Sequence, residues 1–231
     1  MAAAMAMPTP RQPSFFESSA HGSGVDPTGP AAASTTRPTS LPLRRDQLLA
    51  WQQRVQDHQA PLFASLPAEA PGQPVNGAAS PSSDQQGSLF ASPAPGTPTA
   101  LAGHCNPLGL APLALDFWRW PQPPHRGASL YFVFDRPDPL PWPLLLYVGE
   151  TGRADRRWKG EHDCKGYLAA YAEALGRADL SPMLSIRFWC DVPTQPRARR
   201  QLEQLLIRRW ASPFNKENRD RWATPFTADP D

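Results

Sequence analysis

The sequence is short of the features that define several protein classes. Its 231 residues include only three cysteines, Cys105, Cys164 and Cys190. Such an odd, widely spaced set gives no disulfide framework and, without a Cys-X-X-Cys pair, no structural zinc site. No apolar run reaches the about 20 residues that cross a bilayer, and the N-terminus lacks a basic start followed by a sustained apolar stretch. We therefore expect a cytoplasmic protein with no secretory signal and no membrane partner.

Positive and negative charges nearly balance, whereas proline is abundant. The formal net charge of +2 permits nucleic-acid binding without requiring it. The chain has 30 prolines against 15 glycines, and the interiors of helices and strands reject proline. Two Pro-, Ala- and Ser-rich segments are therefore expected to be disordered, because they bury too little apolar surface to offset chain entropy: residues 1–43 and the linker 64–105. Residues 227–231 form a short tail.

One island of helical pattern separates the two long disordered segments. In LRRDQLLAWQQRVQDHQAPLF, Leu48, Trp51 and Val55 recur at helical spacing, which predicts an amphipathic helix at 45–59 that Pro61 ends. Alone, such a helix is marginal in water. Three interpretations stay open: it docks on a protein partner, it docks on its own domain, or it is a transiently helical patch in a disordered tail.

The pattern changes after Leu115, where aromatic residues cluster. Apolar and aromatic runs predict three strands, at 129–134, 144–149 and 183–192. Helical spacing predicts two longer helices and a short basic one before them, the longer ones at 167–175 and 196–211. This order predicts an α/β domain with a three-stranded antiparallel or mixed sheet flanked by helices. We place it at residues 106–226, after the helical segment 44–63.

Several side chains of this domain are of the types that phosphodiester cleavage requires. The reaction needs an activated water, a cation that stabilises the phosphorane and groups that hold the phosphate. Tyr131 and Tyr147 lie on paired strands and can share one face. Glu203 lies beside an apolar helix stripe, and its carboxylate suits a hard divalent cation. Taken singly, the tyrosines fit a core and Glu203 fits a pair with Arg199 one turn away.

Basic residues gather after the second strand. Gly149 lies where a backbone can approach a phosphate, and four cations follow it: Arg153, Arg156, Arg157 and Lys159. Arg157 could direct two hydrogen bonds at phosphate oxygens, and His162 is a proton-transfer group by type. Taken singly, these two fit a solvated surface, and Asn215 fits a residue that fastens a turn.

The combination of these residues resembles the GIY-YIG nuclease family. Ser129-Leu130-Tyr131 stands in place of the family's first motif, and Tyr147-Val148-Gly149 in place of the second. The family's later residues have matches in the same order: Arg157, His162, Glu203 and Asn215. Each motif alone is weak, but six features in order over about 85 residues are a specific pattern.

The resemblance implies an endonuclease that uses one divalent ion, Mg²⁺ or Mn²⁺, to hydrolyse phosphodiester bonds in nucleic acid. DNA is the expected partner, in a repair, recombination or mobile-element role. Tyr131 would act as, or position, the general base, while Tyr147 and Arg157 would bind the scissile phosphate. His162 would assist proton transfer, Glu203 would hold the metal, and one residue would brace the site, Asn215. Further phosphate contacts are expected from the basic segment: Gly149, Arg153, Arg156 and Lys159.

Two positions depart from the family pattern and favour other hypotheses. Ser129 replaces the usual glycine, and Glu150 stands where some members carry a lysine, for which Arg153 is a substitute. A carboxylate at 150 adds negative charge near the phosphate. The alternative function is therefore a catalytically weak or inactive nucleic-acid-binding module of the same fold, recruited through its N-terminal tail. A third is an interaction protein whose Pro-rich tail and helix are the working part.

Overall fold

The two tyrosine-containing strands pair as an antiparallel hairpin at the centre of the fold. They are β2, Ser129–Asp135, and β3, Leu144–Thr151, and their register sets Tyr131 opposite Gly149. Aromatic and branched side chains fill both strands and suit a pleated, buried surface. The structure is a computed structural model that describes four stretches of the compact unit Pro42–Asp231: residues 43–66, 96–119, 125–159 and 163–226.

Two further strands extend the sheet beyond β2. β4, Ser185–Trp189, pairs antiparallel with β2, and β1, Leu113–Ala114, pairs antiparallel with β4, so the order is β1-β4-β2-β3. The three predicted strands are confirmed, but the predicted three-stranded sheet is one strand short. β1 has two residues, too few to leave a period-two pattern in the sequence. β3 lies at an edge of the sheet, which matters for the site below.

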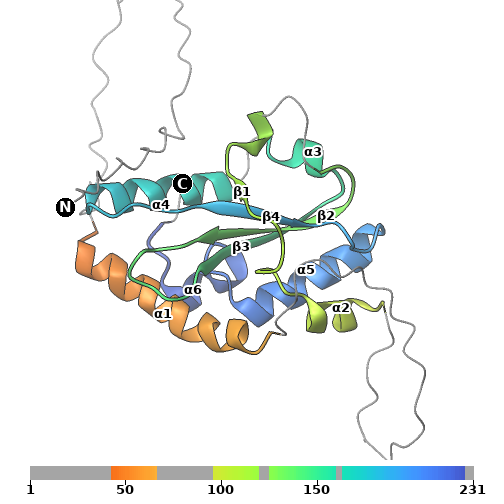
Figure 1. Cartoon of the computed structure of the whole chain (residues 1–231), viewed down its shortest axis with the longest axis horizontal. Coiled ribbons are helices and arrows are strands. Elements are labelled where there is room, and N and C mark those ends of the chain that lie inside the picture. The colour runs from red at the N-terminus through yellow and green to blue at the C-terminus, as the bar shows by residue number, and fades with distance from the viewer. Residues whose placement is uncertain (1–42, 67–95, 120–124, 160–162, 227–231) are drawn as a thin grey trace, which may run out of the picture. The chain divides into compact units, whose positions relative to one another are not determined.

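Helix α5, Pro196–Trp210, covers one face of this sheet (Figure 1). Pro196 suits the first turn, where its missing N–H costs nothing, and Leu202, Leu206 and Trp210 follow at four-residue spacing. These three side chains are fully buried. They share one hydrophobic cluster with inward-facing residues of β2 and β3: Leu130, Phe132, Phe134, Leu145 and Val148. Each large apolar side chain buried in this cluster stabilises the fold by about 2 kcal/mol.

Helix α1, Arg45–Ala64, packs along the outer edge of β3, and its C-terminal half contacts the end of α5 at Trp210. The predicted amphipathic helix is present, but it does not end at Pro61: it continues through this proline to Ala64. Proline removes one backbone hydrogen bond there, and the packing of Phe63 against Phe134 and Trp210 keeps the last turn helical. The structure thus docks α1 on its own domain.

Helix α2, Pro98–His104, lies inside the segment that composition predicts to be a disordered linker. The Thr97 hydroxyl caps it by accepting a hydrogen bond from the N–H of Ala100 at 3.3 Å. The Arg209 guanidinium donates to the carbonyls of Ala102 and Gly103, which fastens α2 to α5. The ordered domain therefore begins earlier than residue 106. Residues 1–42, 67–95 and 227–231 lie outside the described residues.

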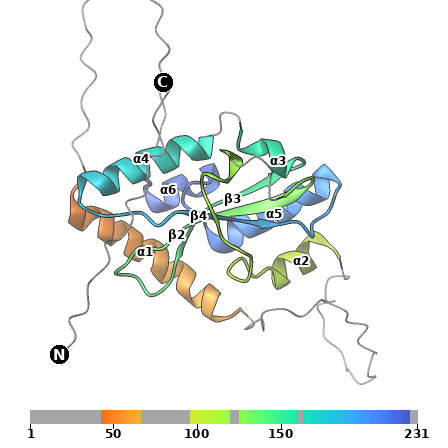
Figure 2. The same ribbon diagram turned by 45° about the horizontal axis from the view of Figure 1, so that its top comes forward.

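The other face of the sheet carries α3, Ala154–Arg157, and α4, Asp163–Arg177 (Figure 2). A buried network joins this side to α1: Gln52 donates to the Tyr171 hydroxyl, which donates to the Asp135 carboxylate, each at 2.6 Å. Three short helices complete the described chain: η1 at Phe117–Arg119, η2 at Lys216–Asn218 and α6 at Arg219–Trp222. Among the described helices, none is both long enough and apolar enough to cross a membrane.

Candidate functional site

Tyr131 lies at the centre of an aromatic cluster on the α3 side of the sheet. Its ring stacks on that of Tyr147, with 6.0 Å between centroids, and meets Trp158 edge-on at 5.8 Å. Phe188 of β4 closes a third side at 6.0 Å. The Tyr131 side chain is completely buried, and this burial raises the pKa of its phenol well above the ordinary value. Tyr131 therefore stays protonated and does not itself face solvent.

Gly149 has no side chain because the Tyr131 ring fills the space where one would be. The two residues are directly opposite in the register of β2 and β3. A β-carbon at position 149 would overlap the Cζ and hydroxyl oxygen of Tyr131 and lie 2.8 Å from its Cε2. This close approach, rather than an open space for a phosphate, accounts for the glycine. The predicted phosphate contact of Gly149 stays a prediction.

Arg157 connects the buried tyrosines to the surface. It is the last residue of α3, its side chain is exposed, and its Nε donates a hydrogen bond to the Tyr131 hydroxyl at 3.2 Å. Tyr147 is half-buried beside it, and the Arg157 cation offsets part of the rise in the pKa of Tyr147 that burial, Cys164 and Glu203 cause. A guanidinium that donates to a tyrosine through Nε can still donate to an anion from its two terminal nitrogens.

Glu203 brings a carboxylate to the same region from α5. Its Oε1 accepts a hydrogen bond from the backbone N–H of Glu150 on β3 at 2.9 Å. Burial, followed by the negative charges of Glu150 and Glu217, raises the pKa of Glu203 to about 7, and Arg157 opposes that rise. Glu203, Tyr147 and Arg157 therefore lie within electrostatic reach of one another.

Glu150 does not stand as an uncompensated charge in this site. Its carboxylate accepts from Nε of the buried Arg199 at 2.6 Å and from Nε of the exposed Arg200 at 3.4 Å. Arg199 also donates to the carbonyls of Pro193 and Thr194 before α5. The pair between Arg199 and Glu203 that helical spacing suggests is not formed, because Arg199 turns to Glu150 instead.

Asn215 fastens the chain after α5 to the outer edge of β3. Its Oδ1 accepts from the N–H of Val148 at 2.9 Å, and its Nδ2 donates to the carbonyl of Val148 at 2.8 Å. Ser212 holds the same Oδ1 through its hydroxyl at 2.6 Å. Asn215 thus braces the strand that carries Tyr147.

Several backbone groups on the outer edge of β3 bond to neighbouring side chains and loops rather than to another strand. Gln59 of α1 bonds both the N–H and the carbonyl of Leu145, at 2.9 and 3.0 Å, and also donates to the carbonyl of Trp210 at 3.0 Å. The N–H of Phe214 donates to the carbonyl of Leu146 at 2.9 Å. Together with Asn215 and Glu203, these contacts protect an edge that would otherwise pair with another chain.

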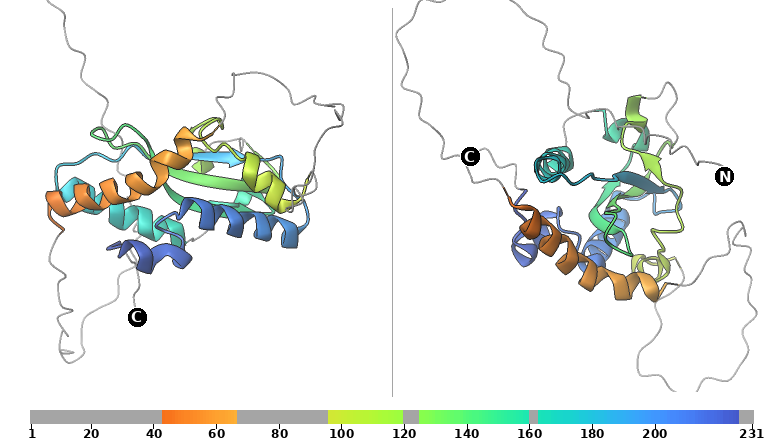
Figure 3. Two further views of the ribbon diagram at one scale, coloured as in Figure 1. Left: turned by 90° about the horizontal axis from the view of Figure 1, so that it is seen from below. Right: turned by 60° about the vertical axis from the view of Figure 1, so that its left-hand side comes forward.

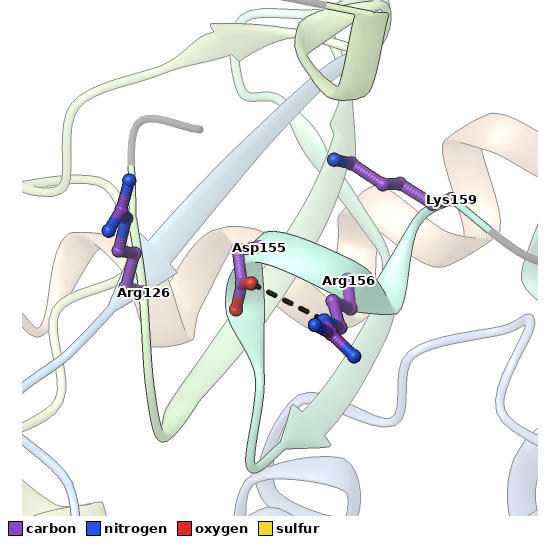
Figure 4. A pocket seen from close by; sticks show the side chains of 4 residues that line it. All are labelled: Arg126, Asp155, Arg156 and Lys159. Carbon is purple, nitrogen blue, oxygen red and sulfur yellow. Dashed lines mark ion pairs between the residues drawn. The ribbon is translucent and has the colours of Figure 1, made fainter. Parts of the chain in front are cut away.

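The remaining basic residues of the candidate set lie apart from the tyrosines. Arg156 and Lys159 line an open hollow of about 520 Å³, together with Arg126 and Asp155 (Figure 4). Asp155 pairs with Arg156 at 3.9 Å, the dashed line in the figure. Arg153 is exposed. The structure therefore joins Arg157 directly to Tyr131 and leaves the other three cations on the surrounding surface.

Two members of the site were not identified from sequence, and one expected member is not described. Arg126 precedes β2 and has no pattern of its own. The spacing of Arg199 on the helix predicted a pair with Glu203. Its actual partner, Glu150, is far away in sequence, so no local pattern indicates that pair. His162 lies outside the described residues, so its expected role stays a prediction. Ser129 is buried, and its hydroxyl finds no hydrogen-bond partner among the residues that the structure describes.

Glu203 is the metal ligand that the sequence leads us to expect. Within the described stretches, no group of three or more His, Cys, Asp or Glu residues could enclose an ion. Glu203 has the chemistry of the expected ligand, because its half-buried carboxylate can offer oxygen to a hard cation. One protein carboxylate with several waters is ordinary coordination for Mg²⁺.

No family model, no curated protein and no solved structure matches this chain.

Proposed function

We propose that this protein is a metal-dependent endonuclease that hydrolyses phosphodiester bonds in nucleic acid. One observation carries the proposal. Tyr131, Tyr147 and Arg157, taken from separate motifs, form one contact cluster, and Glu203 is bonded to the strand that carries Tyr147. The resemblance to the GIY-YIG nucleases supports it, because that family combines the same residue types in the same order.

Arg157 and Tyr147 bind the scissile phosphate. Arg157 is exposed and Tyr147 is half-buried, so both are within reach of a ligand. The guanidinium offers paired N–H donors to two phosphate oxygens and stabilises the charge that grows on them in the transition state. The hydroxyl of Tyr147, kept protonated by its raised pKa, donates a further hydrogen bond.

Tyr131 acts as a positioning residue. Its complete burial keeps it from solvent water, which argues against the direct role as general base that the resemblance allows. Its hydroxyl instead accepts the Nε–H of Arg157 and so fixes the direction of the guanidinium. Trp158, Phe188 and Gly149 hold the Tyr131 ring in place from three sides.

Glu203 holds the metal, Mg²⁺ or Mn²⁺. When bound, the ion supplies positive charge at the phosphate and lowers the pKa of the attacking water. The hydrogen bond from the N–H of Glu150 fixes one carboxylate oxygen, Oε1. Among the described residues, Oε2 takes no hydrogen bond, which suits it for the ion.

The charge compensation of Glu150 favours an active enzyme over the inactive binding module. Its carboxylate pairs with Arg199 and Arg200, and these cations offset part of the negative charge that would oppose a phosphate. DNA as the substrate, a role in repair, recombination or mobile elements, and a cytoplasmic location belong to this proposal.

The test is a cleavage screen with the purified full chain. Supercoiled, branched and single-stranded DNA, and matched RNAs, are incubated with Mg²⁺ or Mn²⁺ and separately with EDTA. The proposal predicts cleavage of at least one substrate in metal and none in EDTA. Salt-sensitive binding without cleavage in either metal would instead favour the inactive binding module.

A further inference from the structure

A groove of about 1010 Å³ runs between α2 and α5 and is separate from the tyrosine cluster. The left view of Figure 3 shows the two helices side by side. Pro98 and Thr99 of α2 form one wall, and Leu205 of α5 contributes apolar surface. The contacts of Arg209 with the last turn of α2 hold the two walls together. The groove is therefore a built feature of the domain.

Positive charge is concentrated along this groove. Arg197, Arg200 and Arg208 line it and are exposed. Their spacing of three and eight residues sets them along one side of α5, over about 16 Å of helix at 1.5 Å per residue. α5 contains five arginines and one glutamate, although the entire chain carries a net charge of only +2. The groove is thus the kind of surface that attracts a polyanion.

The groove leads away from the candidate cleavage site. Arg200, in its wall, contacts the carboxylate of Glu150, whose N–H bonds Glu203. Gln204, also in the wall, is the chain neighbour of Glu203. A strand whose scissile phosphate lies at Arg157 and Glu203 would therefore have its flanking phosphates within reach of α5.

The lining distinguishes between two forms of nucleic acid. Proteins that bind single strands stack the bases on aromatic side chains. The described lining has no aromatic residue and consists of Arg, Gln, Pro, Thr and Leu side chains. Such a surface can contact phosphates but offers no aromatic ring on which an unpaired base could stack. The bases of a duplex stack on one another, so a duplex does not require such rings.

We propose that the α2–α5 groove binds the phosphate backbone of a double-stranded nucleic-acid arm that flanks the cleavage site. Arg197 and Arg208 contact phosphates without reading sequence, and Arg200 joins this track to the site. The inference rests on the proposed nuclease function for its orientation. Its test is a binding measurement in EDTA, which succeeds or fails independently of cleavage.

The experiment measures fluorescence anisotropy of a labelled short DNA duplex, and of one of its single strands, with the full chain over a range of salt concentrations. Arg197→Gln/Arg208→Gln removes two groove cations and leaves Arg200 and Glu203 untouched. The matched control, Arg54→Gln/Arg177→Gln, removes two exposed cations from α1 and α4. Loss of two phosphate contacts is expected to weaken duplex binding roughly 10-fold or more and to lower the salt slope by about two.

The proposal requires the groove variant to weaken duplex binding while the control stays near wild type, and the wild type to prefer the duplex over the single strand. Restoring charge with Arg197→Lys/Arg208→Lys should recover most of the affinity, because a phosphate contact needs charge more than a guanidinium. Equal losses in the groove variant and the control would overturn the assignment of the groove. Equal or tighter binding of the single strand would overturn the duplex as its ligand.

Discussion

Tyr131 and Gly149 face each other across β2 and β3, and the tyrosine ring occupies the space that any side chain at position 149 would need. The glycine is thus part of the aromatic cluster, although it contributes no atoms beyond the backbone. The ring is also held by Tyr147 and by the Nε–H of Arg157. The position of Arg157 at the surface therefore depends on Gly149, because the glycine leaves room for the tyrosine ring that Arg157 contacts.

Gly149→Ala is expected to destabilise the fold by about 1–3 kcal/mol, because the added methyl group must displace a tightly packed ring. The displacement should also weaken the contact between Tyr131 and Arg157 and lower cleavage activity. Chemical denaturation measures the first effect. Gly176→Ala is the control: a β-carbon there meets nothing within 4 Å, and alanine favours the helix. Equal stability of the two variants would contradict the packing account of Gly149.

Gln59→Ala should reveal that α1 is part of the folded domain. The substitution removes the side-chain partner of three buried backbone groups, the N–H and carbonyl of Leu145 and the carbonyl of Trp210, at a cost of about 3 kcal/mol or more. Gln53→Ala, on the same helix, removes only an exposed contact with Asp57 and should change the free energy of unfolding by less than about 0.5 kcal/mol. Similar values for the two variants in urea titrations would mean that α1 is not docked in solution.

Arg157→Gln should reduce cleavage on the order of 100-fold, since a charged donor to the transition state is lost. Arg157→Lys keeps the charge but not the fork and should recover only part of the rate. Arg177→Gln, an exposed arginine paired with Glu173 on α4, should cut like the wild type. Single-turnover rates at saturating protein compare the three. A rate for Arg157→Gln equal to that of Arg177→Gln would remove Arg157 from the site.

The pKa of Glu203 predicts how stability depends on pH. Because this pKa is raised from 4.5 to about 7, the folded protein binds the Glu203 proton more tightly than the unfolded chain does. Its contribution to stability is present below pH 4.5 and is lost as the pH rises through 7. Relative to Glu203→Gln, the wild type should therefore lose at most about 3 kcal/mol over this range.

A divalent ion should reverse that loss. At pH 8 the Glu203 carboxylate is ionised, so Mg²⁺ or Mn²⁺ should raise the Tm of the wild type and leave Glu203→Gln unchanged. At pH 6 the proton competes with the ion and the rise in Tm should shrink. Differential scanning fluorimetry at the two pH values measures this without any cleavage. An equal rise in Tm for both proteins would exclude Glu203 as the ligand.

The sequence predicts those parts of the domain that local pattern controls. Alternation and aromatic content indicate β2, β3 and β4, and four-residue spacing indicates α5. The two-residue β1 and the Pro-rich start of α2 leave no such pattern, because pairing with β4 and packing against α5 stabilise them. Contacts between residues far apart in sequence could not be predicted for the same reason. In the sequence, Gln59 is one polar residue of an amphipathic helix, yet it is fully buried against the edge of β3.

The candidate site could likewise be predicted only in part. Residue type and order predict Tyr131, Tyr147, Arg157 and Glu203, and the structure brings them to one region. Order alone does not show that Tyr131 is completely buried and acts through Arg157. It also does not show that Arg199 compensates Glu150, because these two residues approach each other only when α5 packs against β3.

The central claim, metal-dependent cleavage through Glu203, is tested most directly by one comparison of rates. Glu203→Gln keeps the size of the side chain and its acceptor for the N–H of Glu150 but cannot hold a divalent cation well. Glu173→Gln removes an equal charge from the exposed face of α4. In single-turnover cleavage at pH 8 with Mg²⁺ or Mn²⁺, we predict a loss on the order of 100-fold or more for Glu203→Gln and a wild-type rate for Glu173→Gln. Equal rates for the two variants would contradict the account.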